Sequence, residues 1–460
     1  MRDLWRSVSE NQVVSCIADL LPEGTVLVGG CIRDFFLGID PQDIDIIVPV
    51  DVWVIARRIA HRFNTTPFWL DKECRVARIS IPDTTIYLDI AAPRKPTIEE
   101  DLWMRDLTIN ALAYDIKDRR IIDPTGGIDD LKTGLIRILS EETLVQDPLR
   151  ALRCIRFSLQ FGFSITEESY TLLRRHAPEG IQVAPERIKQ ELVKALSLSS
   201  GARFFRLLDE TGYLQQLFPD MCIFEGPPCR DLLGHAILTV ECVDRLLPEI
   251  DMMFPGSREH FQAPLESGVS RMVVLTLAGF LHDLTGMCIS RTNGREGRTA
   301  REPSAGALKA EGILRRYAFS TRAGRAIRSI IQGFFFLEAF AEAERSTKRI
   351  LHRFCSRTGS FVPETLVLVR AHDIQKADTE EQRRTEILER TWSYFTGEFQ
   401  QNRRSPLVTG QDVIHELGIK PGPSVGSYLN RIEEARAEGE ITTPEQAHAL
   451  LRKLGTTHRE

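Results

Sequence analysis

This sequence lacks several features that would assign it to other classes of protein. None of its apolar stretches reaches the length needed to cross a membrane, and its first residues contain no apolar signal core, so we expect a cytoplasmic protein with no membrane partner. Its nine cysteines include no CxxC pair, which favours reduced thiols over disulfides or zinc ligands. The formal net charge of -5 argues against a protein that coats nucleic acid non-specifically, but it allows an enzyme with positive charge concentrated at one RNA site.

The 460 residues change character near Glu141. Before that point, short runs at strand spacing alternate with helical patterns, and after it apolar residues recur almost only at helical spacing. We therefore expect an α+β fold, with a mixed sheet and its helices followed by an elongated all-α region. The expected strands cover residues 25–28, 43–48, 76–81, 85–90, 111–115 and 120–122.

The segment Val28–Val48 is the most informative part of the chain. Asp43 and Asp45 lie two residues apart in an expected strand, so both carboxylates project from the same face of the sheet. Two such oxygen ligands suit Mg²⁺, which keeps other positions for water and substrate phosphates. The preceding Gly29-Gly30 pair allows close approach of a triphosphate to the backbone and to the start of a helix. Together these features are the minimum equipment for nucleotidyl transfer by two metal ions, although a DxD alone also fits a surface hairpin with solvated carboxylates.

A third carboxylate lies in another expected strand. Asp89, in the sequence IYLDI, would complete an acidic cluster with Asp43 and Asp45. The alternative is a solvated charge on an edge strand.

The combination GG-x-x-RD, then LG, then DxD resembles the signature of the class II tRNA nucleotidyltransferase and bacterial poly(A) polymerase family, within the polymerase-beta-like nucleotidyltransferases. The resemblance implies a polymerase-beta-like catalytic domain followed by a helical neck, body and tail. It also implies catalytic roles for the three carboxylates and nucleotide binding by Gly29, Gly30, Arg33 and Asp34.

A second motif, Met104–Asp115, resembles the RRDFTINA motif that contacts the ribose in this family. The resemblance assigns nucleotide binding to Arg105, Asp106 and Asn110. A carboxylate can accept a 2′-hydroxyl proton, and an arginine can bind a phosphate or orient that carboxylate. The first arginine of the family motif is Met104 here, so its contribution is missing or comes from another side chain.

A third motif, QDPLRALRCIR, resembles the EDxxR motif with which the family reads the incoming base. We expect Asp147 and Arg150 to lie on one face of a helix over 147–160, with Arg153 and Arg156 continuing the stripe. The resemblance implies that the aspartate and arginine bind the edge of cytosine or adenine, whose amino group beside a ring nitrogen matches an acceptor beside a donor fork. The leading glutamate is Gln146 here, which cannot brace the arginine with a salt bridge.

Histidines and aspartates in the helical region have the spacing of an HD domain. His235, His282-Asp283 and Asp373 are the candidate ligands of a divalent metal. The basic residue that usually follows the His-Asp pair is absent, so a scaffold that supports tRNA is the alternative to a metal-dependent phosphohydrolase acting on RNA ends.

The chain divides into four expected domains: a nucleotidyltransferase head over 1–137, a base-recognition neck over 138–220, an HD-like body over 221–400 and a tRNA-binding tail over 401–460. By resemblance, tRNA is bound at its acceptor stem and at its elbow, where shape and phosphates are recognised rather than sequence.

The segment between Asp89 and Arg105 bears on the product. Full CCA-adding relatives usually have a longer flexible loop here, which helps to switch the pocket from CTP to ATP. The short segment resembles the CC-adding subtype, which uses CTP and leaves the last nucleotide to a separate A-adding enzyme. Complete CCA addition from CTP and ATP, A-addition and poly(A) synthesis stay open.

Overall fold

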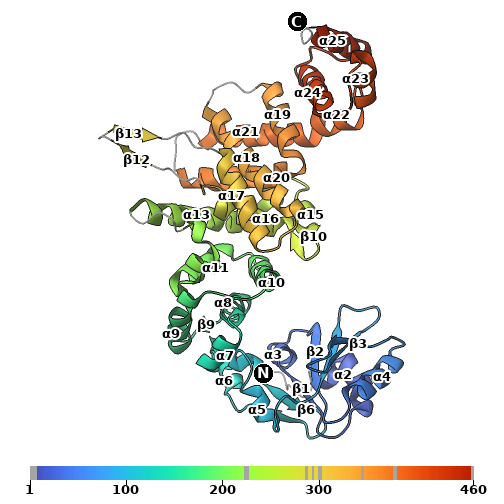
Figure 1. Ribbon diagram of the computed structural model, residues 1–460, viewed down its shortest axis with the longest axis vertical. Helices are drawn as coiled ribbons and strands as arrows, with labels where there is room; N and C mark the ends of the chain where they lie inside the picture. Colours follow the sequence, from blue (N-terminus) through green and yellow to red (C-terminus); the bar gives the residue numbers. More distant parts are fainter. Residues whose placement is uncertain are drawn as a thin grey trace. The chain divides into compact units, whose positions relative to one another are not determined.

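The computed structural model describes residues 8–221, 227–284, 289–292, 295–298, 303–342, 347–376 and 381–456. The chain forms two compact units (Figure 1). Unit one comprises residues 1–184 and 207–217, and unit two comprises residues 185–206 and 218–460. None of the described helices combines the length and the apolar composition of a transmembrane span.

Unit one is built on a seven-stranded mixed sheet with the order β3-β4-β5-β2-β1-β6-β7. Its strands are β1 (Val26–Val28), β2 (Asp43–Ile47), β3 (Phe68–Asp71), β4 (Val76–Ser80), β5 (Tyr87–Ala91), β6 (Ala113–Asp115) and β7 (Arg120–Ile122). The β2–β5 pair is parallel, and the other pairs are antiparallel. All six expected strands are therefore present, and the edge strand β3 is an addition.

The two faces of the central strands differ in polarity. Ile44 and Ile46 of β2 and Leu88 and Ile90 of β5 are fully buried or nearly so. Helix α4 (Val52–Arg62) packs against β4 and β5. The alternating residues of β2, the aspartates, point to the other face because successive side chains of a strand alternate. The apolar half of each strand thus anchors a rigid support for the carboxylates.

Unit one also contains helices and a short parallel pair of strands. They are α2 (Gln12–Ile17), α3 (Gly30–Leu37), α5 (Ile98–Leu102), α6 (Gly127–Thr133), α7 (Glu141–Gln146), α8 (Leu149–Phe161), α9 (Glu167–His176), α12 (Tyr213–Leu217), β8 (Leu135–Ile136) and β9 (Ser164–Ile165). The expected helix over 147–160 begins two residues late, at Leu149. Asp147 is extended, with φ -144° and ψ 94°, because the residue before a proline disfavours the helical conformation. Asp147 and Arg150 therefore do not share a helix.

In the residues that the structure describes, unit two is helical apart from two short hairpins. These are β10 (Pro264–Glu266) with β11 (Val269–Ser270), and β12 (Ile289–Thr292) with β13 (Arg295–Arg298). Its helices are α10 (Pro185–Leu196), α13 (Pro227–Leu246), α14 (Ile250–Met253), α15 (Arg258–Gln262), α16 (Arg271–Leu281), α17 (Pro303–Arg316), α18 (Thr321–Glu342), α19 (Lys348–Thr358), α20 (Val362–Asp373), α21 (Glu381–Tyr394), α22 (Gln400–Arg404), α23 (Gly410–Leu417), α24 (Pro423–Ala437) and α25 (Pro444–Thr456). Helix α11 (Gly201–Thr211) contributes residues to both units. Helices α23 to α25 enclose an apolar cluster of their own that includes Val413, Ile432 and Leu451.

Candidate active site

Strand pairing brings two of the three expected carboxylates directly beside each other. In the parallel β2–β5 pair, Asp45 lies opposite Asp89, and Asp43 precedes Asp45 by two residues on the same face. The Asp43 side chain is 62% exposed, whereas that of Asp89 is 13% exposed. The cluster thus extends from the edge of the sheet into its interior.

An arginine from the neighbouring strand completes this cluster. Arg78 of β4 lies opposite Asp89 in the antiparallel β4–β5 pair. Its Nε and Nη2 atoms donate to the two oxygens of Asp89, each at 2.7 Å, and Nη2 lies 3.8 Å from Asp43. The hydrogen bonds to Asp89 raise the pKa of Arg78. Sequence reasoning missed this residue, because only the pairing of β4 with β5 places it beside the carboxylates.

The surroundings of Asp45 strongly perturb its ionisation. Burial raises the pKa of Asp45 to about 6; Arg105 opposes this shift, and the charges of Asp89 and Asp43 add to it. A bound divalent cation would favour the ionised form of Asp45 and so offset the effect of burial. Three carboxylates on one face also supply the oxygen ligands that Mg²⁺ prefers. The residues therefore fit the cation. In the described part of the chain, these three carboxylates do not form a group whose ligand atoms all lie within 4.8 Å of one another.

The glycine turn lies against the same cluster. Gly29 has φ +79°, and its N–H donates to the carbonyl of Leu112 at 2.8 Å. A side chain at Gly29 would collide with the guanidinium of Arg105 and would lie 3.6 Å from Asp45 Oδ2. The positive φ therefore favours glycine, and a side chain here would displace the guanidinium of Arg105. The buried Nε of Arg105 makes no hydrogen bond, and the ion-pair distance of its Nη2 to Asp101 is 3.8 Å, so this cation is available to a phosphate.

Most of the expected ribose and phosphate ligands form one network of hydrogen bonds. Asp106 accepts bonds from Asn110 Nδ2 at 3.0 Å and from Arg153 Nε at 2.7 Å. Arg33 bonds Asn110 and also Asp34, whose Oδ1 lies 2.7 Å from Arg33 Nη2. Burial opposes ionisation of Asp106, but Arg153 and these hydrogen bonds hold its pKa below the usual value. Asp106 is therefore an anion that is fixed in position.

The arginines of α8 differ in what they contact. Arg150 Nη1 donates to the carbonyl of Arg105 at 3.3 Å, and Arg153 reaches Asp106. Arg156 is 6% exposed, donates to Gln160 Oε1 at 2.7 Å and lies 3.9 Å over the ring of Phe157. Arg150 and Arg153 thus join the ribose motif, whereas these contacts of Arg156 hold it within α8.

Asp147 is positioned by the start of the same helix. Its Oδ1 accepts the N–H of Leu149 at 3.3 Å, and its backbone carbonyl accepts the N–H of Arg150 at 3.0 Å. The extended conformation before Pro148 places Asp147 at the start of α8, next to Arg150 in the chain but outside the helix.

In unit two, the structure brings together only part of the expected HD set. His235 Nε2 lies 3.3 Å from His282 Nε2. Asp373 accepts a 2.6 Å hydrogen bond from Arg384 and has a ligand oxygen within 4.8 Å of a ring nitrogen of His372. Asp283, which follows His282, is 7% exposed. The third side chain beside the two histidines is His372. Sequence reasoning missed His372, although its proximity to Asp373 in the chain was a usable signal.

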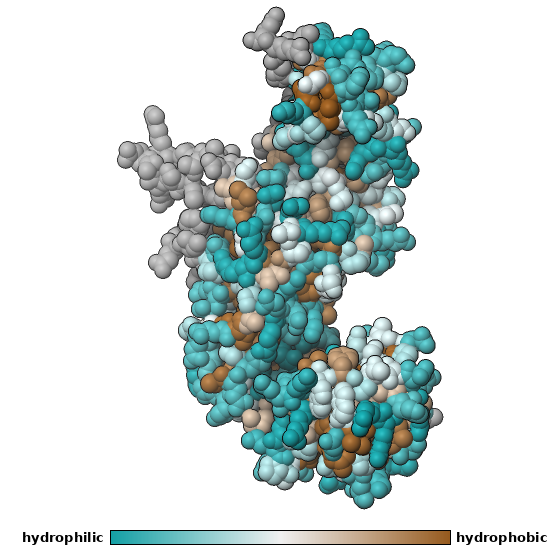
Figure 2. All heavy atoms as spheres, turned by 45° about the vertical axis from the view of Figure 1, so that its right-hand side comes forward, coloured by the Kyte–Doolittle hydropathy of each residue, from teal (hydrophilic) through white to brown (hydrophobic). Residues whose placement is uncertain are grey.

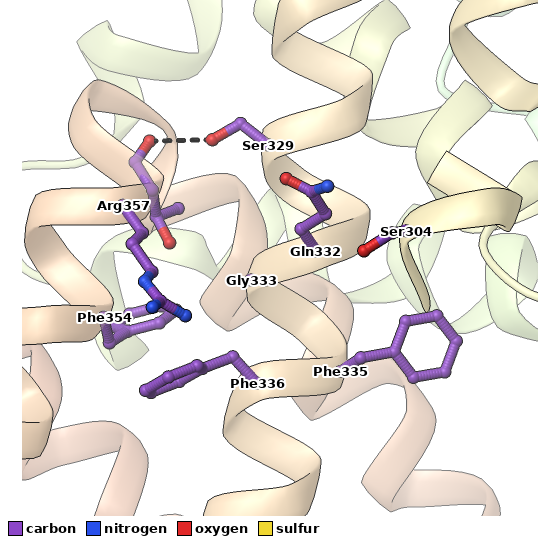
Figure 3. A pocket seen from close by; sticks show the side chains of 9 residues that line it. Ser304, Ser329, Gln332, Gly333, Phe335, Phe336, Phe354 and Arg357 are labelled. Carbon is purple, nitrogen blue, oxygen red and sulfur yellow. Dashed lines mark hydrogen bonds between the residues drawn. The ribbon is translucent and has the colours of Figure 1, made fainter. Parts of the chain in front are cut away.

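A separate cavity of about 470 Å³ lies among α17, α18 and α19 and contains none of the expected site residues (Figure 3). Among the residues that line the cavity, the Ser329 hydroxyl donates to the carbonyl oxygen of Thr358 at 3.1 Å. The guanidinium carbon of Arg357 lies 5.7 Å from the centre of the Phe336 ring. The face shown in Figure 2 is mainly hydrophilic, with apolar side chains in small separate groups.

Three regions of the sequence match known protein families. Residues 25–137 match the poly(A) polymerase head domain, residues 162–224 match an RNA- and SrmB-binding site of polymerase A, and residues 304–453 match tRNA nucleotidyltransferase domain 2. The first match contains the carboxylates, the glycine turn and the ribose motif.

Whole-length relatives carry related names. The chain is 28% identical to a CC-adding tRNA nucleotidyltransferase of Synechocystis over 95% of both chains. It is 29% identical to an A-adding tRNA nucleotidyltransferase of Deinococcus radiodurans, over 94% of this chain and 96% of the relative. It is 27% identical to a CC-adding tRNA nucleotidyltransferase of Geobacter sulfurreducens, over 95% of this chain and 93% of the relative.

Solved structures share the fold. A CCA-adding enzyme with CTP superposes with a TM-score of 0.68 at 23% identity, over 99% of this chain and 97% of that one. The Thermotoga maritima CCA-adding enzyme complexed with tRNA gives a TM-score of 0.65 at 23% identity, over 98% of each chain. The α+β architecture expected from the sequence is thereby confirmed.

Proposed function

Because the chain belongs to the class II tRNA nucleotidyltransferase and poly(A) polymerase family, we propose that it adds C residues from CTP to the 3′ end of tRNA. The observation that carries this proposal is the convergence of three groups within unit one: the carboxylates of β2 and β5, the Gly29 turn beside Arg105, and the Asp106–Arg153 pair. Metal dependence is typical of this family.

The carboxylates support an in-line transfer. Asp43 and Asp45, with Asp89, would hold Mg²⁺, which supplies a lowered pKa for the attacking hydroxyl and neutralises charge on the triphosphate. The 3′-hydroxyl of the tRNA attacks the α-phosphate of the nucleotide, the bond to the β-phosphate breaks, and pyrophosphate leaves. The close approach that the Gly29-Gly30 turn allows and the cation of Arg105 orient the triphosphate against the sheet. The two hydrogen bonds from Arg78 keep Asp89 aligned during this step.

The ribose and base readers belong to the same unit. Asp106, held as an anion by Arg153 and Asn110, accepts a hydrogen bond from the ribose 2′-hydroxyl. Asp147 and Arg150 present an acceptor beside a donor fork, which matches cytosine and adenine but not uracil or guanine. The contact of Arg150 with the carbonyl of Arg105 supplies part of the support that a glutamate at position 146 would otherwise give.

The short connections in unit one favour CC addition over complete CCA addition. The turn between β3 and β4 contains only residues 72–75, and the link between β5 and Arg105 folds into α5, whose Leu102 is fully buried. A packed helix offers little freedom for a switch from CTP to ATP. Three of the long matches are CC-adding enzymes, and the Deinococcus radiodurans relative makes A-addition the second candidate.

We test the product with tRNA that ends at the discriminator base and with the same tRNA ending in C-C. With CTP alone the first substrate should gain two nucleotides, and with ATP the second should gain none. The Asp43→Asn, Asp45→Asn double variant should extend neither. A single A added to the C-C end would instead make the protein a CCA-adding or A-adding enzyme, and long A tails would make it a poly(A) polymerase.

The proposal also assigns parts to the rest of the chain. Residues 1–137 form the catalytic head, 138–220 the neck, 221–400 the body and 401–460 the tail. The tRNA acceptor stem binds at the head and neck, the elbow binds at the tail, and a separate enzyme adds the terminal A. This tRNA substrate is also our reason for proposing a cytoplasmic enzyme.

A further inference from the structure

Three imidazole groups in unit two converge from three helices. His235 lies in α13, His282 directly follows α16, and His372 lies in α20. One ring nitrogen from each lies within 4.8 Å of the others, and His282 and His372 are buried. The separation of His235 Nε2 from His282 Nε2 is 3.3 Å. With Zn–N bonds of about 2.0–2.1 Å, two ligands of a tetrahedral ion lie about 3.3–3.4 Å apart.

The backbone determines which nitrogen of His282 carries the proton. Its Nδ1 lies 2.8 Å from the carbonyl oxygen of Gly279, an acceptor, so Nδ1 carries the proton. The lone pair is therefore on Nε2, the atom that faces His235. Such an outer hydrogen bond to a carbonyl is the usual way in which a metal-binding histidine is oriented.

The nearby carboxylates are neutralised by an arginine. Arg384 Nη1 donates to Asp373 at 2.6 Å and to Glu338 at 3.1 Å, and all three side chains are buried. Glu338 Oε2 lies 3.7 Å from His372 Nδ1. Arg384 balances the charge of both carboxylates, although Asp373 Oδ2 makes no hydrogen bond. The group formed by His235, His282 and His372 contains only imidazole nitrogens. Such donors suit Zn²⁺ and neighbouring transition metals, whereas Mg²⁺ prefers oxygen.

We propose that His235, His282 and His372 bind a divalent transition-metal ion that links α13, α16 and α20. This site differs from the His/Asp set expected from the sequence, because Asp373 pairs with Arg384 and His372 takes its place. It is independent of the carboxylates of unit one and of the proposed transfer reaction. The alternative for the same geometry is a direct hydrogen bond between neutral His235 and His282 rings.

The test uses the full chain carrying Asp43→Asn and Asp45→Asn, so that the head carboxylates do not bind the probe. The protein is stripped with a chelator, dialysed against Zn²⁺, Co²⁺ or Mg²⁺, and analysed for bound metal. We expect about one equivalent of Zn²⁺ or Co²⁺, the visible absorption of nitrogen-bound Co²⁺, and a higher Tm with Zn²⁺. Mg²⁺ at the same concentration should not be retained.

Variants identify the ligands. His235→Gln and His372→Gln should lower the affinity for Zn²⁺ by about tenfold or more and remove the Tm increase. His235 is half-buried, so we expect the fold to tolerate its replacement. His260→Gln is the matched control, because His260 is also a half-buried histidine of unit two but pairs with Glu364. Absence of bound Zn²⁺, equal binding by His235→Gln and the parent, or equal retention of Mg²⁺ would overturn the proposal.

Discussion

At the scale of single residues, Asp45 should make the transfer activity rise with pH and the stability of the metal-free protein fall with pH. In the metal-free protein its raised pKa of about 6 means that the carboxyl is mostly protonated below that pH, so protons compete with the metal that it would hold. At subsaturating Mg²⁺, transfer should therefore rise as the pH passes through about 6. A carboxyl whose folded pKa exceeds its unfolded value of 3.8 contributes stability at low pH, and this contribution is lost as the pH rises from about 4 to 6.

Asp45→Asn should accordingly abolish transfer but raise the Tm of the metal-free protein at neutral pH. The gain is on the order of 3 kcal/mol, because the pKa is raised by about two units from 3.8 and each unit corresponds to about 1.4 kcal/mol. Thermal unfolding at pH 5 and pH 8 measures it, and the gain should be smaller at pH 5. Asp43→Asn is the control: its exposed side chain should leave the Tm unchanged while transfer is also lost. A lower Tm for Asp45→Asn at pH 8 would contradict the argument.

Replacement of Arg78 should change the dependence of transfer on the concentration of Mg²⁺. Arg78→Met removes a positive charge beside Asp89 and Asp43, so the half-saturating Mg²⁺ concentration should fall and the pH midpoint of transfer should rise. The value of kcat should fall about tenfold because Asp89 loses its alignment. Titration of Mg²⁺ at several pH values measures all three. Arg62→Met, which removes a surface pair with Asp19, should change none of them.

At the scale of elements, the strands were predictable and the beginning of α8 was not. Alternating apolar residues mark β2 and β5 because one face of each is buried, and the spacing of Asp43 and Asp45 follows directly from that alternation. Helical periodicity predicts that α8 begins at Asp147. In the structure the helix begins at Leu149, because Pro148 restricts the conformation of the residue before it. Arg78 was missed because only the pairing of β4 with β5 places it beside the carboxylates, and the pattern of a single segment carries no information on such pairing. His372 was missed although it precedes Asp373 directly in the chain.

Pro148 therefore controls the position of Asp147, the residue that we propose reads the base. Pro148→Ala should allow Asp147 to become helical, move its carboxylate away from the start of α8, and reduce discrimination of CTP against UTP by about tenfold or more. Single-nucleotide incorporation with each triphosphate measures the ratio. Pro185→Ala, at the first position of α10, is the control and should leave the ratio unchanged. Unaltered discrimination in Pro148→Ala would show that the extended residue is not required.

At the scale of the whole molecule, the segment from α23 to α25 has its own apolar cluster. It also contacts α19 through ion pairs, including Arg353 with Glu434 at 2.6 Å. Deleting residues 406–460 should raise KM for tRNA about tenfold, since phosphate contacts at the elbow would be lost, while KM for CTP stays the same. Steady-state kinetics with both substrates separates the two effects. Equal increases in both constants would place the tail in general stability rather than in tRNA binding.

The bond between Asp106 and Arg153 has a consequence for synthesis of the chain. The last strand of the sheet ends at Ile122, but the cation that neutralises buried Asp106 comes from α8, more than a full turn beyond Leu149. A nascent chain that has emerged only as far as the sheet therefore contains an uncompensated buried anion. The ribosome must release the first turns of α8 before the N-terminal region can close, so a translational pause just before this helix would hold the emerging protein open.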